Sequence, residues 1–351
     1  MDNIGGAERV GLTLSRDLNA DMYSTVVNKD AIKKLGFNVN VKKIGWIPKN
    51  APFRQQMAMS RFRKLNLAKR YDCYIIDGDW AMSGAVNNKP NIWYVHSPIR
   101  EIWDLYKYTR QNNVPFVARP IFDAWVRYNR HLNLKYVRHV KQLVCNSINT
   151  QNRIKKYLKR DAVVINPPIE TDKFHFKKSG DYWLSVNRLI THKRVDIQMK
   201  AFRDMPDEKL VIVGCYEKSR HFEAYAKYIK SIKPNNVTLI HSVDFDELVN
   251  IYANCKGFIT TSKNEDFGMT PVEAMASGKP VIAPNEGGYK ETVIDGITGR
   301  LLDNMSVHNL ILAVKEISKN PISYKNACLK QSKQFGTKIF IKKIMEQMEK
   351  M

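Results

Sequence analysis

Residues 263–284 constrain the fold most, because apolar runs enclose a segment that contains glycine and proline. Residues 257–261 form a short run with β-branched side chains, and residues 281–283 form another. Apolar runs bounded by turn residues are typical of buried strands. The chain between these two runs must leave one strand and return to the next, so the pattern predicts a loop followed by a helix.

The start and end of that helix can be predicted from single residues. Thr270 suits the N-cap, Pro271 suits the first helical position, and Glu273 completes a capping box. Gly278 is expected to end the helix. The backbone amides of residues 267–269 would then lie at the positive end of the helix, where phosphate groups bind well.

Two acidic residues, Glu265 in the loop and Glu273 in the first turn, flank this expected anion site. On its own, the pattern favours the simpler interpretation of a solvated loop acid and a capping residue. Gly268 allows a ligand to approach the backbone closely, because glycine has no side chain. Motifs elsewhere in the chain argue against the simpler interpretation and favour an anion site at these residues.

Charge is distributed unevenly along the chain, which has a formal net charge of +23 over 351 residues. Residues 1–165 contain 29 Lys and Arg against 12 Asp and Glu, or +17, which leaves +6 for the rest. An excess of this size predicts a polyanionic partner, which could be nucleic acid, an anionic bilayer or a phosphorylated substrate.

The cysteines and the apolar runs indicate the compartment. The five cysteines are odd in number, scattered and never in a Cys-x-x-Cys pair, which argues against disulfides or a zinc site. These residues are Cys73, Cys145, Cys215, Cys255 and Cys328. No apolar run approaches the ~20 residues of a membrane span, so we expect a soluble or peripheral protein in a reducing compartment.

Strand-like and helical patterns alternate along the whole chain, which predicts an α/β fold with parallel sheets. Expected strands cover residues 23–27, 39–44, 72–77, 91–95, 142–145, 162–165, 182–186, 209–213 and 237–240. Asn166-Pro167-Pro168 is expected to end a first domain, because consecutive prolines continue neither a helix nor a sheet. A final helix is expected over residues 337–350.

The first half has three candidate features. Gly5-Gly6 precede a helical pattern, and such a turn allows close approach to a phosphate or sugar. His96 follows the expected strand 91–95, at the edge where ligands collect in parallel sheets. Trp103 comes after it, at the head of an expected helix. Asp77-Gly78-Asp79 could hold a metal, but two acids in a strand-end loop are more typical of a turn.

Basic side chains are concentrated in a helical stretch at 52–70, and they alternate with aromatic side chains over 119–141. Interleaving of this kind can bind nucleic acid or a bilayer surface, or it can belong to a solvated helix. In the second half, Arg188 and Lys193 follow the expected strand 182–186. Two cations there could neutralise a diphosphate, or could form ordinary surface salt bridges.

Taken together, these motifs resemble the retaining glycosyltransferases of family 4, in the form used by the mannosyltransferase-like branch. The match covers nearly the whole chain, is strongest over 182–299, and departs at Tyr216 and Ser242, where the family has glycine. The resemblance implies that Glu265 and the amides of Phe267, Gly268, Met269 and Thr270 hold the donor sugar and diphosphate. It also implies that Glu273 binds the ribose, that Arg188 and Lys193 hold the diphosphate, that His96 lines the sugar pocket, and that Gly5 and Gly6 contact the donor.

The resemblance also implies a GT-B fold, with two Rossmann-like domains that face a cleft. We expect an acceptor-side domain over 1–166, a nucleotide-sugar domain over 167–335, and a helix over 336–351 that returns to the first domain. The family has a strand directly before the Gly-Gly turn, at the centre of the first sheet. The printed sequence has only Met1 to Ile4 there, so we expect a shortened start.

The implied activity is transfer of a hexosyl unit, preferably mannosyl from GDP-mannose rather than a UDP-sugar, to a glycan or lipid-linked acceptor. We expect no cofactor and no metal, because cations and a helix end already supply positive charge. We also expect a peripheral protein at an anionic membrane, on its cytoplasmic face, without nucleic acid. The alternatives are a basic nucleic-acid-binding protein and an inactive glycosyltransferase-like scaffold.

Overall fold

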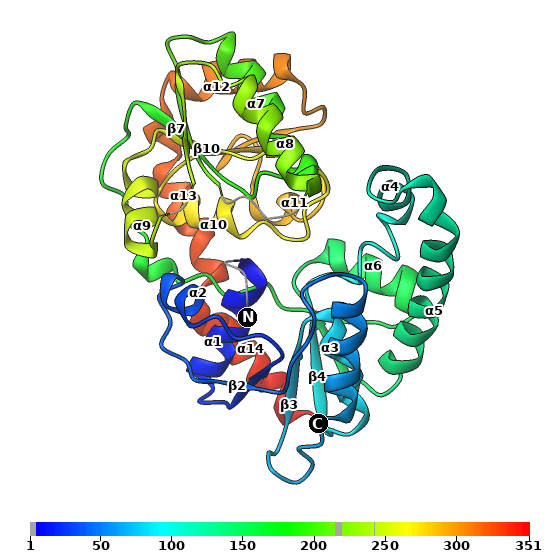
Figure 1. Cartoon of the computed structure of the whole chain (residues 1–351). Helices are drawn as coiled ribbons and strands as arrows, with labels where there is room; N and C mark the ends of the chain where they lie inside the picture. The colour runs from blue at the N-terminus through cyan, green and yellow to red at the C-terminus, as the bar shows by residue number, and fades with distance from the viewer. Residues whose placement is uncertain (1–4, 215–219, 242) are drawn as a thin grey trace. The chain divides into compact units, whose positions relative to one another are not determined.

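The computed structural model describes residues 5–214, 220–241 and 243–351, and it consists of two compact units (Figure 1). The first unit comprises Met1–Asn166 and Phe340–Met351, and the second comprises Pro167–Ile339. Cys215, Tyr216 and Ser242 lie outside the described residues. In the part of the chain that is described, no helix is long and apolar enough to span a bilayer.

The second unit is built on one parallel sheet with the strand order β12-β11-β10-β7-β8-β9. Its elements are β7 (Tyr182–Val186), α7 (Val195–Arg203), β8 (Lys209–Val213), α8 (Arg220–Ser231), β9 (Val237–Ile240), α9 (Phe245–Asn254), β10 (Gly257–Ile259), α10 (Met269–Ala276), β11 (Val281–Pro284), α11 (Tyr289–Thr292), β12 (Gly299–Leu302), α12 (Val307–Ser318) and α13 (Lys325–Ser332).

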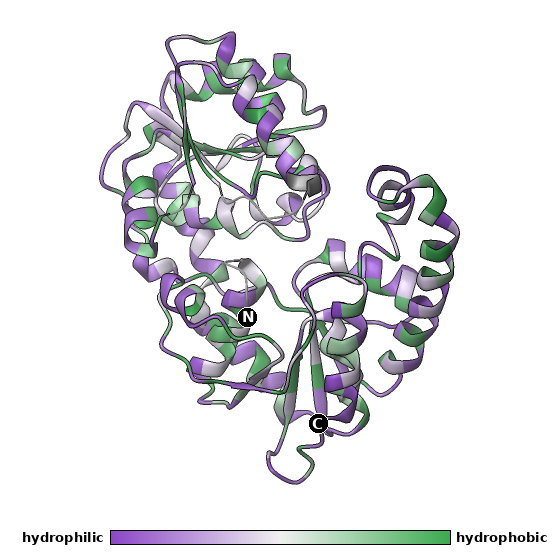
Figure 2. Ribbon diagram, viewed as in Figure 1, coloured by the Kyte–Doolittle hydropathy of each residue, from purple (hydrophilic) through white to green (hydrophobic). Residues whose placement is uncertain are grey.

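Both faces of this sheet are buried. Successive side chains of a strand point to opposite faces, so Trp183 packs in one apolar cluster and Leu184 in another. Phe258 and Ile259 of the neighbouring strand divide in the same way. Strands β7 and β10 are therefore buried over most of their length, and helices cover the sheet on both sides (Figure 2).

The first unit contains two separate parallel sheets, β1-β2 and β3-β4-β5-β6. Its elements are α1 (Gly6–Asp17), β1 (Met22–Ser24), α2 (Lys29–Lys34), β2 (Val41–Lys43), α3 (Phe53–Lys64), β3 (Tyr74–Asp77), the 3-10 helix η1 (Asp79–Val86), β4 (Asn91–Val95), α4 (Tyr106–Asn112), α5 (Arg119–Val137), β5 (Gln142–Cys145), α6 (Ile148–Leu158), β6 (Val163–Val164) and most of α14 (Thr337–Glu349).

Helix α14 completes the core of the first unit, although it comes last in the chain. Its residues Phe340 and Ile344 are buried in one cluster with Val10 of α1 and Tyr94 of β4. The rings of Tyr94 and Phe340 make an edge contact with centroids 5.6 Å apart. The opposite face of β4 packs in another cluster, with η1, α5 and α6.

Two helix starts differ from the sequence predictions. Helix α10 begins at Met269, with Gly268 as N-cap, so the predicted cap at Thr270 is wrong. The chain turns into the helix at Gly268, which has φ of +91°, and glycine adopts this conformation at little cost. The predicted helix head at Trp103 is also wrong, because turns occupy that segment and α4 begins at Tyr106.

Candidate functional site

The candidate site of the second unit lies where β7 and β10 end. These strands are neighbours in a parallel sheet, so the loops that follow their carboxyl ends meet at one edge. Lys193 comes from the loop after β7 and Glu265 from the loop after β10. The Lys193 ammonium lies 2.7 Å from Glu265 Oε2, and the Ser262 hydroxyl donates a hydrogen bond to the same oxygen.

The ion pair determines the charge of Glu265. Burial by itself would raise the pKa of this carboxyl group, but the Lys193 ammonium and the Ser262 hydroxyl outweigh burial and lower the pKa to about 2. Glu265 is therefore an anion at any physiological pH. An ammonium has three N–H donors, so its bond to Glu265 leaves capacity for a further anionic acceptor.

Hydrogen bonds hold the two loops together. The Thr261 hydroxyl donates to the carbonyl oxygens of Lys193, at 2.7 Å, and Arg194, at 3.0 Å. The buried Gln198 amide donates to that hydroxyl at 2.9 Å, and the Lys263 N–H donates to the His192 carbonyl at 2.8 Å. The loop after β7 is thus fixed to the end of β10, which keeps Lys193 in place.

Arg194 is a site residue that the sequence analysis did not single out. Its guanidinium lies 2.7 Å from Glu286 in the loop after β11 and donates to the Thr261 carbonyl at 2.6 Å. It therefore links the loops after three neighbouring strands. Its position beside Lys193 was the only signal in the sequence, and the strand order that brings Glu286 near could not be predicted from it.

Glycines allow the loops of the site to pack closely. A Cβ atom at Gly268 would lie 2.6 Å from the Tyr289 ring, and one at Gly287 would lie 2.4 Å from the Glu265 carbonyl oxygen. At Gly288 it would lie 2.4 Å from Phe267 Cα. The Gly288 N–H also donates to the Glu265 carbonyl at 2.9 Å. The Gly287-Gly288 pair thus supports the backbone that carries Glu265.

At the start of α10, backbone groups rather than side chains are placed to bind a ligand. The Phe267 side chain is buried and packs on Phe335, so this residue can offer only its backbone. Thr270 is half-buried in the first turn. Glu273 is buried and accepts a hydrogen bond from the Tyr252 hydroxyl at 3.0 Å. No side chain at the N-cap makes a capping hydrogen bond, so the predicted capping box is wrong. With the N-cap at Gly268, Glu273 lies two residues beyond the N3 position that a capping box requires.

The remaining predicted residues lie elsewhere. Arg188 is exposed in the loop directly after β7. Gly5 and Gly6 form the N-cap and first residue of α1, in the first unit. His96 also belongs to the first unit and follows β4. The structure therefore brings together Glu265, Lys193 and the start of α10 in one unit, and places His96 in the other.

His96 has a partner, Asp77, that the sequence analysis interpreted as a turn residue or, less favoured, a metal ligand. Its Nε2 lies 2.5 Å from Asp77 Oδ1, at the carboxyl ends of the adjacent strands β3 and β4. Burial would lower the pKa of the imidazole, but Asp77 outweighs burial and raises it. The Asn146 amide and the Thr150 hydroxyl donate to the His96 carbonyl. These contacts hold the histidine in a fixed orientation.

Solved structures show the same fold. An Anabaena protein, HepE, solved in complex with UDP and glucose, superposes with a TM-score of 0.77 at 17% identity, covering 100% of this chain and 98% of that one. The fold is thus the GT-B fold of glycosyltransferases, as the sequence predicted. Residues 168–335 match the family model described as glycosyl transferases group 1.

Two curated relatives show where the sequence similarity lies. An uncharacterized glycosyltransferase of Methanocaldococcus jannaschii is 27% identical over 51% of this chain and 50% of its own. An alpha-1,3/1,6-mannosyltransferase of Dictyostelium discoideum is 30% identical over 46% of this chain and 43% of its own. The aligned part of this chain thus spans about half the length of these relatives, and the chain is similar to mannosyltransferases there.

Proposed function

We propose that the protein is a retaining hexosyltransferase that moves a mannosyl unit from GDP-mannose to a glycan or lipid-linked acceptor. The observation that supports this proposal most is the Lys193–Glu265 pair beside the start of α10. A nucleotide diphosphate sugar has a diphosphate that needs positive partners and a sugar carbon that becomes positive as the bond breaks. The site offers groups of both signs within one edge of the sheet.

Each group has a distinct task in this proposal. Lys193, Arg188 and the amides at the start of α10 would neutralise the departing diphosphate. Glu265, held ionised by its pKa of about 2, would stabilise the oxocarbenium-like sugar. Charges fixed before the reaction usually make the largest contribution to catalysis, because they need no reorganisation as the transition state forms.

Retention of configuration follows if the acceptor attacks from the side on which the diphosphate leaves. The acceptor hydroxyl then gives its proton to the leaving phosphate oxygen as the new glycosidic bond forms. This scheme requires no separate general base. Glu273 would bind the donor ribose, and His96, held by Asp77, would contact the sugar.

The donor can be tested by calorimetric titration of the protein with GDP-mannose, UDP-glucose and ADP-glucose. We expect the GDP sugar to bind tightest and the product anomer, determined by NMR, to keep the donor configuration. If a UDP sugar bound more tightly, the proposed donor would be wrong, but the proposed class of reaction would still hold. If none of the three sugars binds, the scaffold without activity becomes the better interpretation.

Activity is expected to survive treatment with EDTA. Lys193, Arg188 and a helix end supply positive charge at the diphosphate, which in other transferases a divalent ion provides. Turnover should be measured with EDTA and again after Mg²⁺ or Mn²⁺ is added back. Complete loss of turnover in EDTA, restored by either ion, would show that the reaction depends on a metal.

A membrane-borne acceptor is part of the proposal, and an exposed apolar loop in the first unit supports it. Phe116 and Val117 of this loop and Ile121 in the first turn of α5 are exposed by 80%, 84% and 75%. The loop lies between α4 and α5, and the Arg119 guanidinium lies 5.4 Å from the centroid of the Phe116 ring. Apolar side chains flanked by cations suit the interface of an anionic bilayer, here the cytoplasmic leaflet.

Replacing Phe116 and Val117 together by serine is expected to weaken binding to vesicles with anionic lipid at least about tenfold. Burial of each such side chain contributes roughly 1.5–3 kcal/mol, and each nearby cation about 1 kcal/mol. Leu312→Ser is the control, because Leu312 is 53% exposed in the second unit. Binding to vesicles of neutral lipid and to duplex DNA is measured as well, in each case over a series of salt concentrations. Unchanged vesicle binding would contradict the docking site, and tight DNA binding at physiological salt would favour a nucleic-acid-binding protein.

A further inference from the structure

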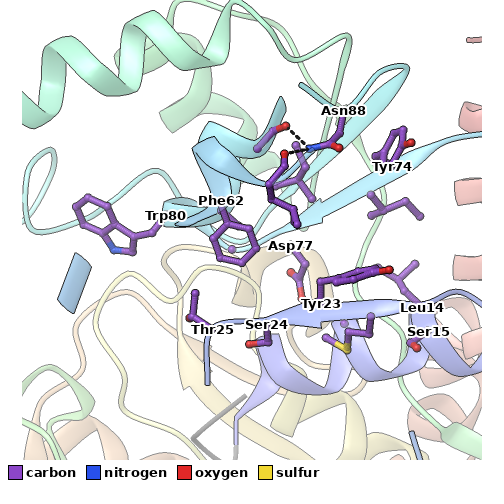
Figure 3. A pocket seen from close by; sticks show the side chains of 18 of the residues that line it. Leu14, Ser15, Tyr23, Ser24, Thr25, Phe62, Tyr74, Asp77, Trp80 and Asn88 are labelled. Atoms are coloured by element: carbon purple, nitrogen blue, oxygen red, sulfur yellow. Dashed lines mark hydrogen bonds between the residues drawn. The ribbon is translucent and has the colours of Figure 1, made fainter. Parts of the chain in front are cut away.

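A buried hydroxyl group usually donates to a backbone carbonyl group nearby. Ser15 and Tyr74, which line a pocket of the first unit (Figure 3), show this arrangement. The Ser15 hydroxyl donates to the Ala20 carbonyl at 2.6 Å, and the Tyr74 hydroxyl donates to the Leu67 carbonyl. A buried hydroxyl group without a hydrogen bond is costly, so bonds of this kind are explained by the stability of the fold.

Three hydroxyl groups beside Glu265 are arranged differently. Thr260, Ser262 and Tyr289 are all buried, with 1%, 0% and 2% of their surface exposed. The Tyr289 hydroxyl lies 2.8 Å from the Thr260 hydroxyl and within hydrogen-bonding reach of Ser262. The Ser262 hydroxyl donates to Glu265 Oε2. These hydroxyl groups therefore contact one another, and the group ends on a charged side chain of the candidate site.

The carboxylate determines the direction of these hydrogen bonds. Glu265 is ionised and can only accept, so the single hydroxyl proton of Ser262 points to it. The Ser262 oxygen can then only accept, and the Tyr289 hydroxyl is placed to donate to it. Thr260 in turn donates to Tyr289, which satisfies all three hydroxyl groups. Hydrogen bonds in such a chain strengthen one another, so the Tyr289 hydroxyl makes Ser262 a better donor to Glu265.

The ring of Tyr289 is fixed by its surroundings, and so is the position of its hydroxyl group. Tyr289 is the first residue of α11 and directly follows Gly288, whose N–H donates to the Glu265 carbonyl. Its ring lies against the backbone at Gly268, where an added Cβ would be 2.6 Å from Tyr289 Cε1. One side chain thus contacts both the hydroxyl groups that hold Glu265 and the start of α10.

Packing alone would be satisfied by a phenylalanine at this position. Tyr289 belongs to an apolar cluster with Phe267 and Val272. Replacing both partners of a buried hydrogen bond by apolar groups of the same shape is nearly neutral for stability. A phenylalanine and a valine in place of Tyr289 and Thr260 would therefore fill the same space. The pair of hydroxyl groups is better explained by the orientation of Glu265 than by the stability of the core.

We propose that Tyr289 is a positioning residue for Glu265, which it orients through the hydroxyl groups of Thr260 and Ser262. The inference rests on the proposed function for the task of Glu265, but the orientation of the carboxylate can be measured without a donor. Tyr289 acts as a neutral phenol, because burial and the Glu265 carboxylate raise its pKa well above the ordinary value.

The charged groups around this chain of hydroxyl groups lie in the loop after β7. Lys193 and His192 act on Glu265 and lower its pKa, and Arg194 acts on Tyr289. A substitution that removes only a hydroxyl group leaves all three of these side chains in the protein. A change in the titration of Glu265 can then be assigned to the hydroxyl group that was removed.

The test compares Tyr289→Phe and Thr260→Val, which each remove a hydroxyl group and keep the shape of the side chain, with their double variant. Tyr182→Phe is the control, because the Tyr182 hydroxyl donates to the Ile251 carbonyl at 2.8 Å at the first residue of β7, away from its carboxyl end. The titration of the Glu265 carboxyl group is followed by ¹³C NMR without donor, and Glu265→Gln assigns the signal. The values of kcat, KM for the donor and Tm are measured as well.

We expect Tyr289→Phe and Thr260→Val each to raise the midpoint of the Glu265 titration by about 0.5–1 pH unit. Each should also lower kcat about tenfold and change KM by less than about twofold, because the carboxylate is displaced rather than lost. The double variant should lose no more than about either single variant, since the hydroxyl groups act as one chain. Tyr182→Phe should change neither the midpoint nor kcat.

An unchanged midpoint in Tyr289→Phe, or in Thr260→Val if the first variant does not fold, would overturn the proposal even if Tm falls. Tyr289 would then support only the core. A raised midpoint in a protein that transfers no sugar would be a different result. The positioning of Glu265 by Tyr289 would hold, and the proposed function would be contradicted.

Discussion

Lys193→Ala and Arg188→Ala are each expected to lower kcat by about 10²- to 10³-fold, as the loss of one preorganised donor does. The Lys193 variant loses the ammonium that lies 2.7 Å from Glu265. The Arg188 variant loses an exposed cation directly after β7. Steady-state kinetics with saturating donor measure the effect, and the fold should stay intact.

Lys209→Ala is the matched control. Lys209 also forms an ion pair, with Asp181, but it lies at the opposite end of the sheet and is 63% exposed. Its removal should leave kcat unchanged, because exposed ion pairs contribute little. Wild-type turnover in the double variant Arg188→Ala, Lys193→Ala would show that the diphosphate is held elsewhere.

The Lys193 variant should also change the pH profile. Without the ammonium, the largest of the effects that lower the pKa of Glu265 is lost, so this pKa rises from about 2. The activity that remains should then fall as the pH is lowered through the raised pKa, whereas the activity of the wild type should not fall in that pH range. In the wild type, stability due to this carboxylate is fully present above its ordinary pKa of 4.5 and is lost as the pH falls towards about 2.

Gly288→Ala is expected to lower kcat/KM by about 10²-fold or more and to lower Tm. The φ of Gly288 is −71°, which alanine adopts without strain, so the effect comes from packing alone. The new Cβ would lie 2.4 Å from Phe267 Cα and 2.6 Å from the Asp266 carbonyl oxygen. Both are backbone atoms, so the loop that carries Glu265 must move, and small displacements of reacting groups are costly.

Gly296→Ala is the control, because this substitution introduces backbone strain without a collision. Gly296 has φ of +73° but no atom within 4 Å of an added Cβ. The substitution should therefore cost roughly 1–2 kcal/mol for the left-handed conformation and leave kcat/KM unchanged. If the two variants lost equal activity, the collision at Gly288 would not be the cause of the loss, and the loop that carries Glu265 would tolerate movement.

Strands that are buried on both faces could be predicted closely from the sequence. Strands β4, β5, β7 and β8 lie inside their sheets and have the predicted bounds, because a central strand of a parallel sheet is a largely apolar run that ends at a turn. Strand β9 also has the predicted bounds, although it lies at the edge of its sheet and is only partly buried. Strand β1 is shorter than predicted, since its residues are only half-buried and its pattern gave no clear end.

What could not be predicted depends on contacts between distant segments. The start of α10 depends on the left-handed backbone of Gly268, which packs on Tyr289 from a later loop. The pairing of His96 with Asp77 depends on the order of strands β3 and β4, and so the acid beside the histidine resembled an ordinary turn residue. Local patterns contain no information about such partners.

The place of helix α14 determines the order in which the protein can fold during synthesis. The second unit is one uninterrupted segment, Pro167–Ile339, so it can acquire its core without residues from other parts of the chain. The first unit is made earlier but needs Phe340 and Ile344 to close its core around Val10 and Tyr94. The half that emerges first is therefore completed last, once helix α14 has also been synthesised, and until then part of its apolar core lacks its cover.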